Sequence, residues 1–107
     1  MKRFVWLSFD LGVKGDYEGM YRWLDYHGAK ECGDSMAYFE YEYSGNFREA
    51  IKKDLNSNVQ LDQRRNRIYI VWKSGTMVTG RFIVGSRRSA PWAGYSGAEE
   101  ESDDTSS

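Results

Sequence analysis

The chain has 107 residues, which fits a single domain, and its 16% aromatic content allows a small core to be built from a few large rings. It contains no apolar run of about 18 residues, and the apolar stretch after its basic start meets Asp10 too early for a signal peptide. A single cysteine, Cys32, excludes an internal disulfide and fits a reducing compartment. We therefore expect a cytoplasmic chain without membrane spans.

The charge is unevenly distributed, although the formal net charge is only −1. Residues 1–98 carry all 15 basic residues against 11 acidic ones, whereas residues 99–107 carry five acidic residues and no basic one. We expect a mildly basic folded domain over residues 1–96 and a disordered acidic tail over 97–107. Such a tail keeps a protein soluble, shields a basic patch, or imitates nucleic acid.

The first elements in chain order are a strand, a helix and a short strand. Residues 4–9 are aromatic and β-branched, which predicts a buried strand that stops at Asp10. Asp16 is a suitable N-cap for a helix that ends near Gly28. The apolar stripe of this helix is formed by Tyr17, Met20, Tyr21 and Leu24. Residues 29–32 are predicted to form the short strand.

The remaining elements are a strand, a second helix and a hairpin. Residues 36–43 alternate strictly, so Ala37, Phe39, Tyr41 and Tyr43 are predicted to share one face. Asn46 and Glu49 have the spacing of a capping box at the start of a helix. Residues 68–72 and 77–84 are predicted strands around a turn at 73–76. The order predicts an α+β, ferredoxin-like β-α-β-β-α-β sandwich, with two helices on one face of an antiparallel sheet and an extra C-terminal strand.

Two single residues are candidates for chemistry. Asp10, at a strand end, is a candidate catalytic residue and metal ligand, because a two-fold axis that added a second carboxylate would suit Mg²⁺ or Mn²⁺. The alternative is a turn-forming aspartate. His27 is the only histidine in the sequence and lies at the end of a predicted helix. This position favours a role as a helix cap over a role as a catalytic base. We expect no other cofactor.

Basic and aromatic residues are interleaved in the C-terminal third. This mixture is typical of contacts to phosphates and splayed bases, and also of protein interfaces. The segment 87–95 follows the last predicted strand, and its two large rings need a surface to pack against, such as the sheet edge or a second subunit. The candidate binding residues are Arg64, Arg65, Arg67, Lys73, Arg81, Arg87, Arg88, Trp92 and Tyr95.

Residues 3–84 resemble the small CRISPR-associated protein that partners the integrase during spacer acquisition. The motifs that carry this resemblance are Phe9-Asp10, Tyr26-His27-Gly28, Ser35-Met36-Ala37-Tyr38-Phe39-Glu40 and Arg67-Ile68-Tyr69-Ile70. The resemblance implies a homodimer in which Asp10 lies near the dimer axis and binds a divalent metal. The residues after Asp10 are Leu11-Gly12-Val13-Lys14 instead of the family's polar and basic ones, which argues against nuclease activity.

A second pattern is similar to the RNA-recognition motif, in which aromatic side chains of the first and third strands stack on bases. Trp6 and Tyr38 occupy such positions on the open face of the predicted sheet. Glu40 and Glu42 place negative charge on the same surface, which disfavours phosphate. This resemblance therefore ranks below the first.

Three functional hypotheses follow from the sequence. The first is a non-catalytic binding protein that acts on DNA, RNA or a nucleoprotein partner and self-associates through its sheet or its C-terminal segment. The second is a metal-dependent nuclease that uses Asp10 across a dimer axis. The third is a protein-interaction module or inhibitor encoded by a mobile element.

Overall fold

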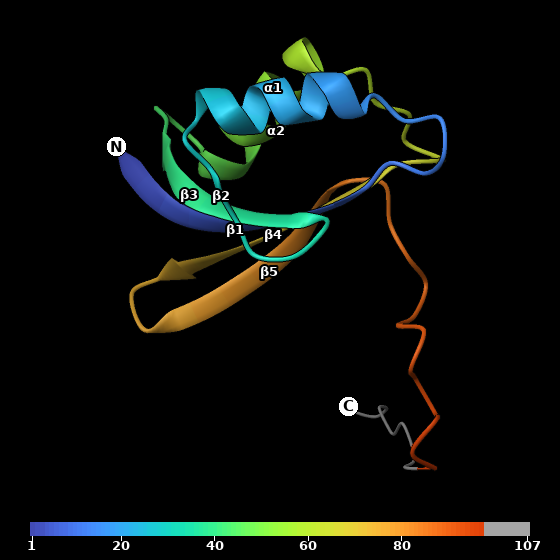
Figure 1. The fold of residues 1–107 in the computed structure, drawn as a ribbon. Helices are drawn as coiled ribbons and strands as arrows, with labels where there is room; N and C mark the ends of the chain where they lie inside the picture. Colours follow the sequence, from blue (N-terminus) through green and yellow to red (C-terminus); the bar gives the residue numbers. More distant parts are fainter. Residues whose placement is uncertain (98–107) are drawn as a thin grey trace.

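A computed structural model of the chain describes residues 1–97, and these form an α+β fold with a five-stranded antiparallel sheet and two helices (Figure 1). The fold class predicted from the sequence is confirmed at this level. The predicted acidic tail at 97–107 lies almost wholly outside the described residues. The elements are β1 (Lys2–Asp10), α1 (Tyr17–Tyr26), β2 (Lys30–Glu31), β3 (Met36–Glu42), α2 (Phe47–Asn58), β4 (Arg67–Ser74) and β5 (Met77–Val84).

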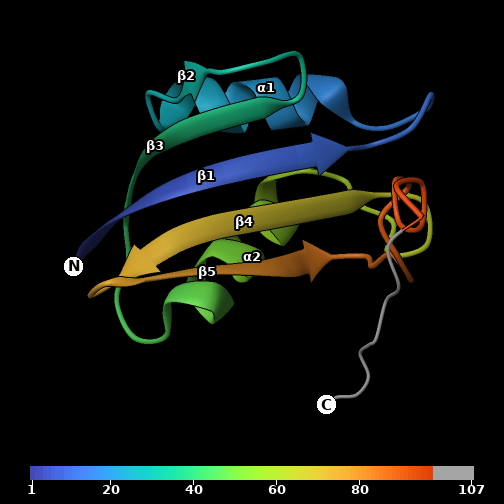
Figure 2. The same ribbon diagram turned by 90° about the horizontal axis from the view of Figure 1, so that it is seen from below.

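The strands lie in the order β2-β3-β1-β4-β5, and each pairs antiparallel with its neighbours. This arrangement is compatible with a ferredoxin-like fold to which β5 adds a strand at one edge. Both helices cover the same face of the sheet (Figures 1 and 2). We call the opposite face, which no helix of residues 1–97 covers, the open face. β1 and β5 end at the same end of the sheet, where β4 begins, and this end positions the candidate site.

Each helix begins at a side chain that accepts a backbone N–H from its first turn. The carboxylate of Asp16 accepts from the N–H of Gly19 at 2.9 Å, and the amide oxygen of Asn46 accepts from the N–H of Glu49 at 3.0 Å. Both N-caps are the ones that the sequence indicates. Neither helix within residues 1–97 has the length and apolar character needed to cross a membrane.

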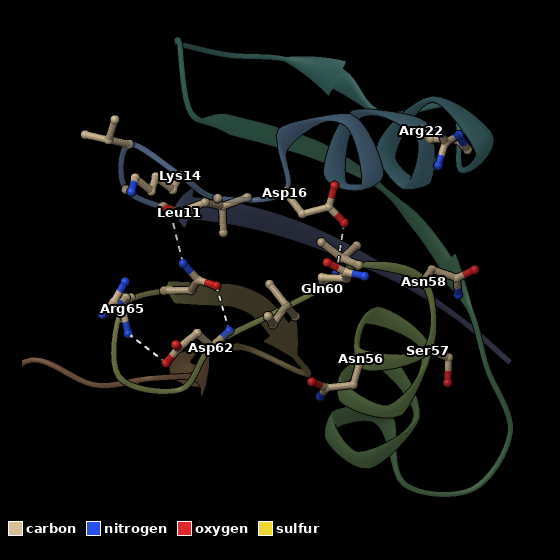
Figure 3. Close-up of a pocket in the computed structure, with 16 residues that line it drawn as sticks. Leu11, Lys14, Asp16, Arg22, Asn56, Ser57, Asn58, Gln60, Asp62 and Arg65 are labelled. Carbon is tan, nitrogen blue, oxygen red and sulfur yellow. Dashed lines mark hydrogen bonds between the residues drawn. The ribbon is translucent and has the colours of Figure 1, made fainter.

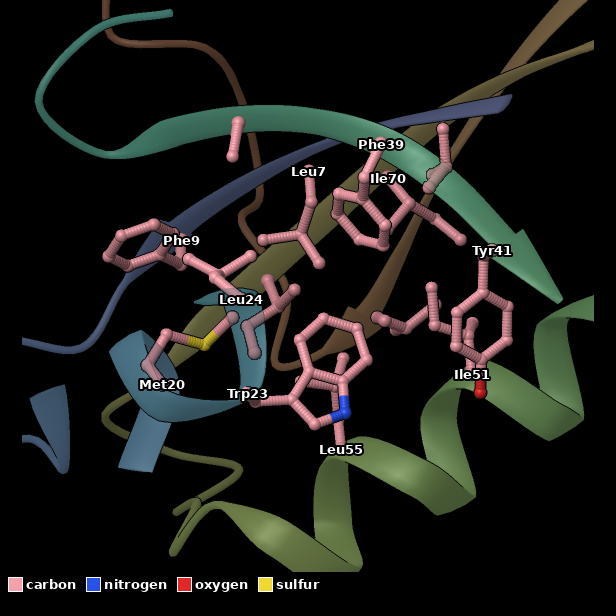
Figure 4. Packing of buried hydrophobic residues seen from close by; sticks show 14 of the residues in the cluster. Leu7, Phe9, Met20, Trp23, Leu24, Phe39, Tyr41, Ile51, Leu55 and Ile70 are labelled. Carbon is pink, nitrogen blue, oxygen red and sulfur yellow. The ribbon is translucent and has the colours of Figure 1, made fainter. Parts of the chain in front are cut away.

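The hydrophobic core fills the space between the helices and the covered face of the sheet (Figure 4). Alternate residues of β1 and β3 point into it, including Leu7, Phe9, Phe39 and Tyr41. Helix α1 contributes Met20, Trp23 and Leu24, and α2 contributes Ile51 and Leu55. Because side chains alternate along a strand, the residues between these inward positions form the open face.

The structure differs from the sequence prediction at element ends and in the buried stripe of α1, where Trp23 is buried and the predicted Tyr21 is exposed. β1 begins at Lys2, because pairing with β3 continues to Glu42. The short strand expected over 29–32 is limited to Lys30–Glu31, which pair with Tyr38 and Ala37. Much of the outer edge of β3 therefore has no strand beside it among the described residues.

Candidate functional site

A groove of about 700 Å³ lies on the open-face side of the sheet, at the end where β1 and β5 stop. Its floor comes from β1, β4 and β5, and its flank comes from the segment 87–92, which leaves the sheet on the side away from the helices (Figure 1). The groove brings together five of the sequence-predicted site residues, which three separate stretches of chain supply. These are Asp10, Arg67, Arg87, Arg88 and Trp92.

Asp10 is held by an arginine within this groove. Asp10 and Arg67 are directly paired residues of β1 and β4, and the Arg67 guanidinium donates to the Asp10 carboxylate at 2.7 Å. The hydrogen bond from Arg67 and a second one from the N–H of Gly12, aided by the positive charge of Arg87, lower the pKa of Asp10. The carboxylate thus stays ionised and neutralises part of the positive charge around it.

A metal bound by Asp10 would have to compete with Arg67 for the carboxylate. Within residues 1–97, no group of three or more His, Cys, Asp or Glu side chains is placed to hold a metal ion. The metal role of Asp10 stays a prediction that depends on a second subunit.

Aromatic rings form the floor and the flank of the groove. Tyr69 and Phe82 are paired residues of β4 and β5, and their rings meet edge to face with centroids 4.8 Å apart. The Tyr69 ring lies across Gly80, where a Cβ atom would approach within 2.7 Å of the ring atom Cε1. Trp92 stands on the flank with 74% of its surface exposed. A flat apolar group in the groove would therefore meet rings on more than one side.

A second group of rings continues along the open face from the groove. Phe4 lies with its ring centroid 4.8 Å from that of Trp6 and 5.6 Å from that of Tyr38. Trp6 is paired with Tyr38 on β3 and with Val71 on β4. The structure thus places the two predicted open-face aromatics, Trp6 and Tyr38, side by side on the uncovered surface.

The other predicted binding residues lie away from the groove. Arg64 and Arg65 are in the loop before β4, where their backbone N–H groups donate to the Asp62 carboxylate. Lys73 and Arg81 lie on the β4–β5 hairpin; the Arg81 guanidinium donates to the carbonyl of Gly80 at 2.8 Å. Tyr95 is 87% exposed beyond the groove.

A larger polar groove, of about 1170 Å³, lies between the loop after β1, the start of α1 and the end of α2 (Figure 3). Several of its polar groups bond to one another. Asp16 accepts from the N–H of Gln60 as well as capping α1, and the buried Asn66 donates to the carbonyl of Leu11 and accepts from the N–H of Asp62. These bonds hold the loop after β1 and the loop after α2 together, and this structural role accounts for the polar groups that form them.

A polar cluster between the helices was missed at the sequence level. The Asp54 carboxylate accepts a hydrogen bond from the Tyr41 hydroxyl at 2.9 Å and lies 3.5 Å from Nε2 of His27. Burial lowers the pKa of His27 against the opposing effect of Asp54, and burial together with Asp54 raises the pKa of Tyr41. His27 directly follows α1, Tyr41 lies on β3 and Asp54 lies on α2, and no local spacing in the sequence links them.

Comparisons with models of protein families, with curated proteins and with solved structures find no match to this chain.

Proposed function

We propose that this protein binds single-stranded nucleic acid on the open face of its sheet, without catalysis. In this proposal the arginines of the groove hold backbone phosphates, and the exposed rings stack on bases. We also infer that β1 to β4 and the two helices form a ferredoxin-like unit that leaves this face free.

The observation that carries the proposal is the convergence of Arg67, Arg87 and Arg88 with Tyr69, Phe82 and Trp92 on one open groove. Arginine presents a fork of N–H donors that suits phosphate oxygens. Aromatic faces stack on any base, which gives affinity with little sequence preference. A groove lined by both kinds of side chain matches the alternation of phosphate and base along a strand.

The open-face rings favour a single strand over a duplex. Phe4, Trp6 and Tyr38 lie on the sheet surface itself, so a base must leave its own stack to contact them. Glu40 of β3 is the direct strand partner of Phe4 on β1, and its carboxylate would repel a phosphate there. The backbone is therefore expected to lie toward β4 and β5, with its bases toward β1 and β3.

Fluorescence anisotropy with labelled DNA and RNA oligonucleotides of about 12 residues tests the proposal. The informative variant is R87A/R88A, and K52A/K53A is its matched control, because that pair removes the same charge from exposed positions on α2. Because Asp10 already pairs with Arg67, we count phosphate contacts from Arg87 and Arg88 only, which predict a slope of log K against log salt near −1.4, at about −0.7 per contact. R87A/R88A should bring the slope close to zero, whereas K52A/K53A should leave it unchanged.

Wild-type protein that fails to bind either oligonucleotide at low salt would refute the proposal, as would equal losses of affinity in the two double variants.

Addition of Mg²⁺ or Mn²⁺ to the same samples tests the nuclease alternative, which requires cleavage that D10A abolishes. Light scattering on the same samples tests self-association, which stays a prediction. A protein that binds no oligonucleotide but co-purifies with a specific protein would favour an interaction module.

A further inference from the structure

The outer edge of β3 carries backbone groups that no strand of residues 1–97 pairs with. Strand β2 pairs only with the first part of β3. On the side of β1, Met1 and Tyr43 exchange both of their backbone hydrogen bonds, at 2.9 and 2.8 Å. Because exchanging pairs alternate with non-exchanging pairs in an antiparallel ladder, the N–H and C=O groups of Glu40 and Glu42 point away from β1. These groups therefore face the position of an added strand.

A groove of about 630 Å³ lies beside this edge. It is lined by residues from the end of α1, from β2 and from β3, among them Tyr26, Gly28, Lys30, Glu40 and Glu42. The chain passes from α1 to β2 through Gly28, whose φ is 67°, and it meets β3 only at Lys30. An extended segment laid beside Glu40 and Glu42 would therefore enter a groove and displace no strand.

Two carboxylates project from this edge on the open face. Glu40 and Glu42 are exposed, and neither is in ion-pair contact with a basic residue of 1–97. The β1 partner of Glu40 is the uncharged Phe4. The β1 partner of Glu42 is Lys2, so a cation on the free side would place that carboxylate between two positive charges. Opposite charges on directly paired residues stabilise neighbouring strands, and the edge is therefore complementary to a basic strand.

A second copy of this chain fits the edge poorly. Antiparallel pairing of two β3 strands about Tyr41 would place Glu40 of each copy directly opposite Glu42 of the other. Pairing about either glutamate would bring two identical carboxylates together. Like charges directly opposite each other destabilise a sheet, whereas a strand with basic side chains at alternate positions gives each glutamate an oppositely charged neighbour.

We propose that the free edge of β3 binds an extended basic peptide of a protein partner, which adds to the sheet as an antiparallel strand. The backbone groups of Glu40 and Glu42 bond to the two peptide residues directly opposite them, and the basic side chains of those residues pair with the two carboxylates. The peptide residue between them points toward the helices, where Tyr26 and Phe39 line the groove and favour an apolar side chain. The arginine groove shares no lining residue with this edge, so each proposal can fail without the other.

Fluorescence anisotropy with the labelled peptide Thr-Val-Arg-Val-Arg-Val-Thr tests the backbone pairing. In the proposed register the N–H groups of the two arginines face β3, and those of the valines face away. We expect N-methylation of both arginines to lower the affinity by about tenfold or more, because two hydrogen bonds are lost, and N-methylation of the two outer valines to change it little. The absence of binding to the wild type at low salt, or equal losses from the two changes, would overturn the proposal.

Charge variants of the protein test the complementarity. E40Q/E42Q should weaken binding of the arginine peptide, and E18Q/E49Q is its matched control, because that pair removes the same charge from exposed positions in the first turns of the helices. E40K/E42K should lose the arginine peptide and bind Thr-Val-Glu-Val-Glu-Val-Thr instead. Equal effects of the two glutamine variants, or no exchange of preference in the lysine variant, would contradict a charge-paired strand.

Hydrogen exchange followed by NMR on the full-length protein locates the added strand. In the free protein the backbone N–H groups of Glu40 and Glu42 should exchange faster than those of Phe39 and Tyr41, and the arginine peptide should slow the exchange of the two glutamates. Peptide binding without this protection would refute strand addition. Protection of the same two groups that rises with protein concentration, without peptide, would assign the edge to a second copy of this chain and overturn the proposal.

Discussion

Gly85 determines how the segment with Arg87 and Arg88 leaves the sheet. Its φ is +69°, in the left-handed region that side chains with a Cβ disfavour, and a Cβ atom there would overlap the carbonyl oxygen of Asn66. The Arg67 side chain is also close, with its Cγ 3.2 Å from that Cβ position. The substitution G85A therefore forces backbone against backbone at the edge of the groove.

Gly75, in the β4–β5 turn, provides a matched control. Its φ is +65°, nearly the same, but a Cβ atom there would meet nothing within 4 Å. G75A should cost only the left-handed conformation, about 1–2 kcal/mol of unfolding free energy. G85A adds an overlap that only a backbone shift relieves, about 1–3 kcal/mol more.

Urea unfolding followed by tryptophan fluorescence measures both variants. We expect G85A to unfold at a clearly lower urea concentration than G75A, with similar slopes. Because the shift moves Arg87 and Arg88, we also expect G85A alone to lose oligonucleotide affinity. If the free energies of unfolding of the two variants agreed within about 0.5 kcal/mol, the inference that a Cβ atom at position 85 overlaps the Asn66 carbonyl would be wrong.

Three further outcomes are expected. R67A should lower the free energy of unfolding at pH 7, because it removes the ion pair with Asp10. This difference from the wild type should shrink as the pH falls through the lowered pKa of Asp10, because a protonated Asp10 no longer pairs with Arg67. Urea unfolding between pH 7 and 2.5 measures the difference, and a difference that stays constant over this range would contradict the reasoning. Burial lowers the pKa of His27 below its usual 6.5, so the stability of the wild type should decline as the pH falls below 6.5. H27Q should make that decline less steep. An NMR titration in which the His27 imidazole has its midpoint at or above 6.5 would contradict the reasoning. W92A should weaken oligonucleotide binding by about 1–3 kcal/mol and leave the unfolding midpoint unchanged, since the ring is largely exposed; a matching loss of stability would show that Trp92 is structural instead.

Much of the fold could be predicted because its signals are local. The alternation of residues 36–43 identifies the inward face of β3, and Asp16 and Asn46 mark the starts of both helices. The short strand β2 was predicted over 29–32, but its exact ends were not, because the number of residues that pair depends on where the neighbouring strand lies.

The candidate site was predicted as a list of residues without their arrangement. The basic and aromatic side chains of the C-terminal third were visible, but the pairing of Arg67 with Asp10 joins residues 57 positions apart. The cluster of His27, Tyr41 and Asp54 was missed for the same reason.

The sequence by itself determined which groups are available: a mildly basic stretch over residues 1–98, five acidic residues after it, many arginines in the C-terminal third and many large aromatic rings. Hydrophobic periodicity and caps act over a few residues, so they can be recognised without the fold. The tertiary structure decided which groups meet. Antiparallel pairing placed the end of β1, the start of β4 and the end of β5 together, and that long-range register made one groove from side chains that are distant along the chain.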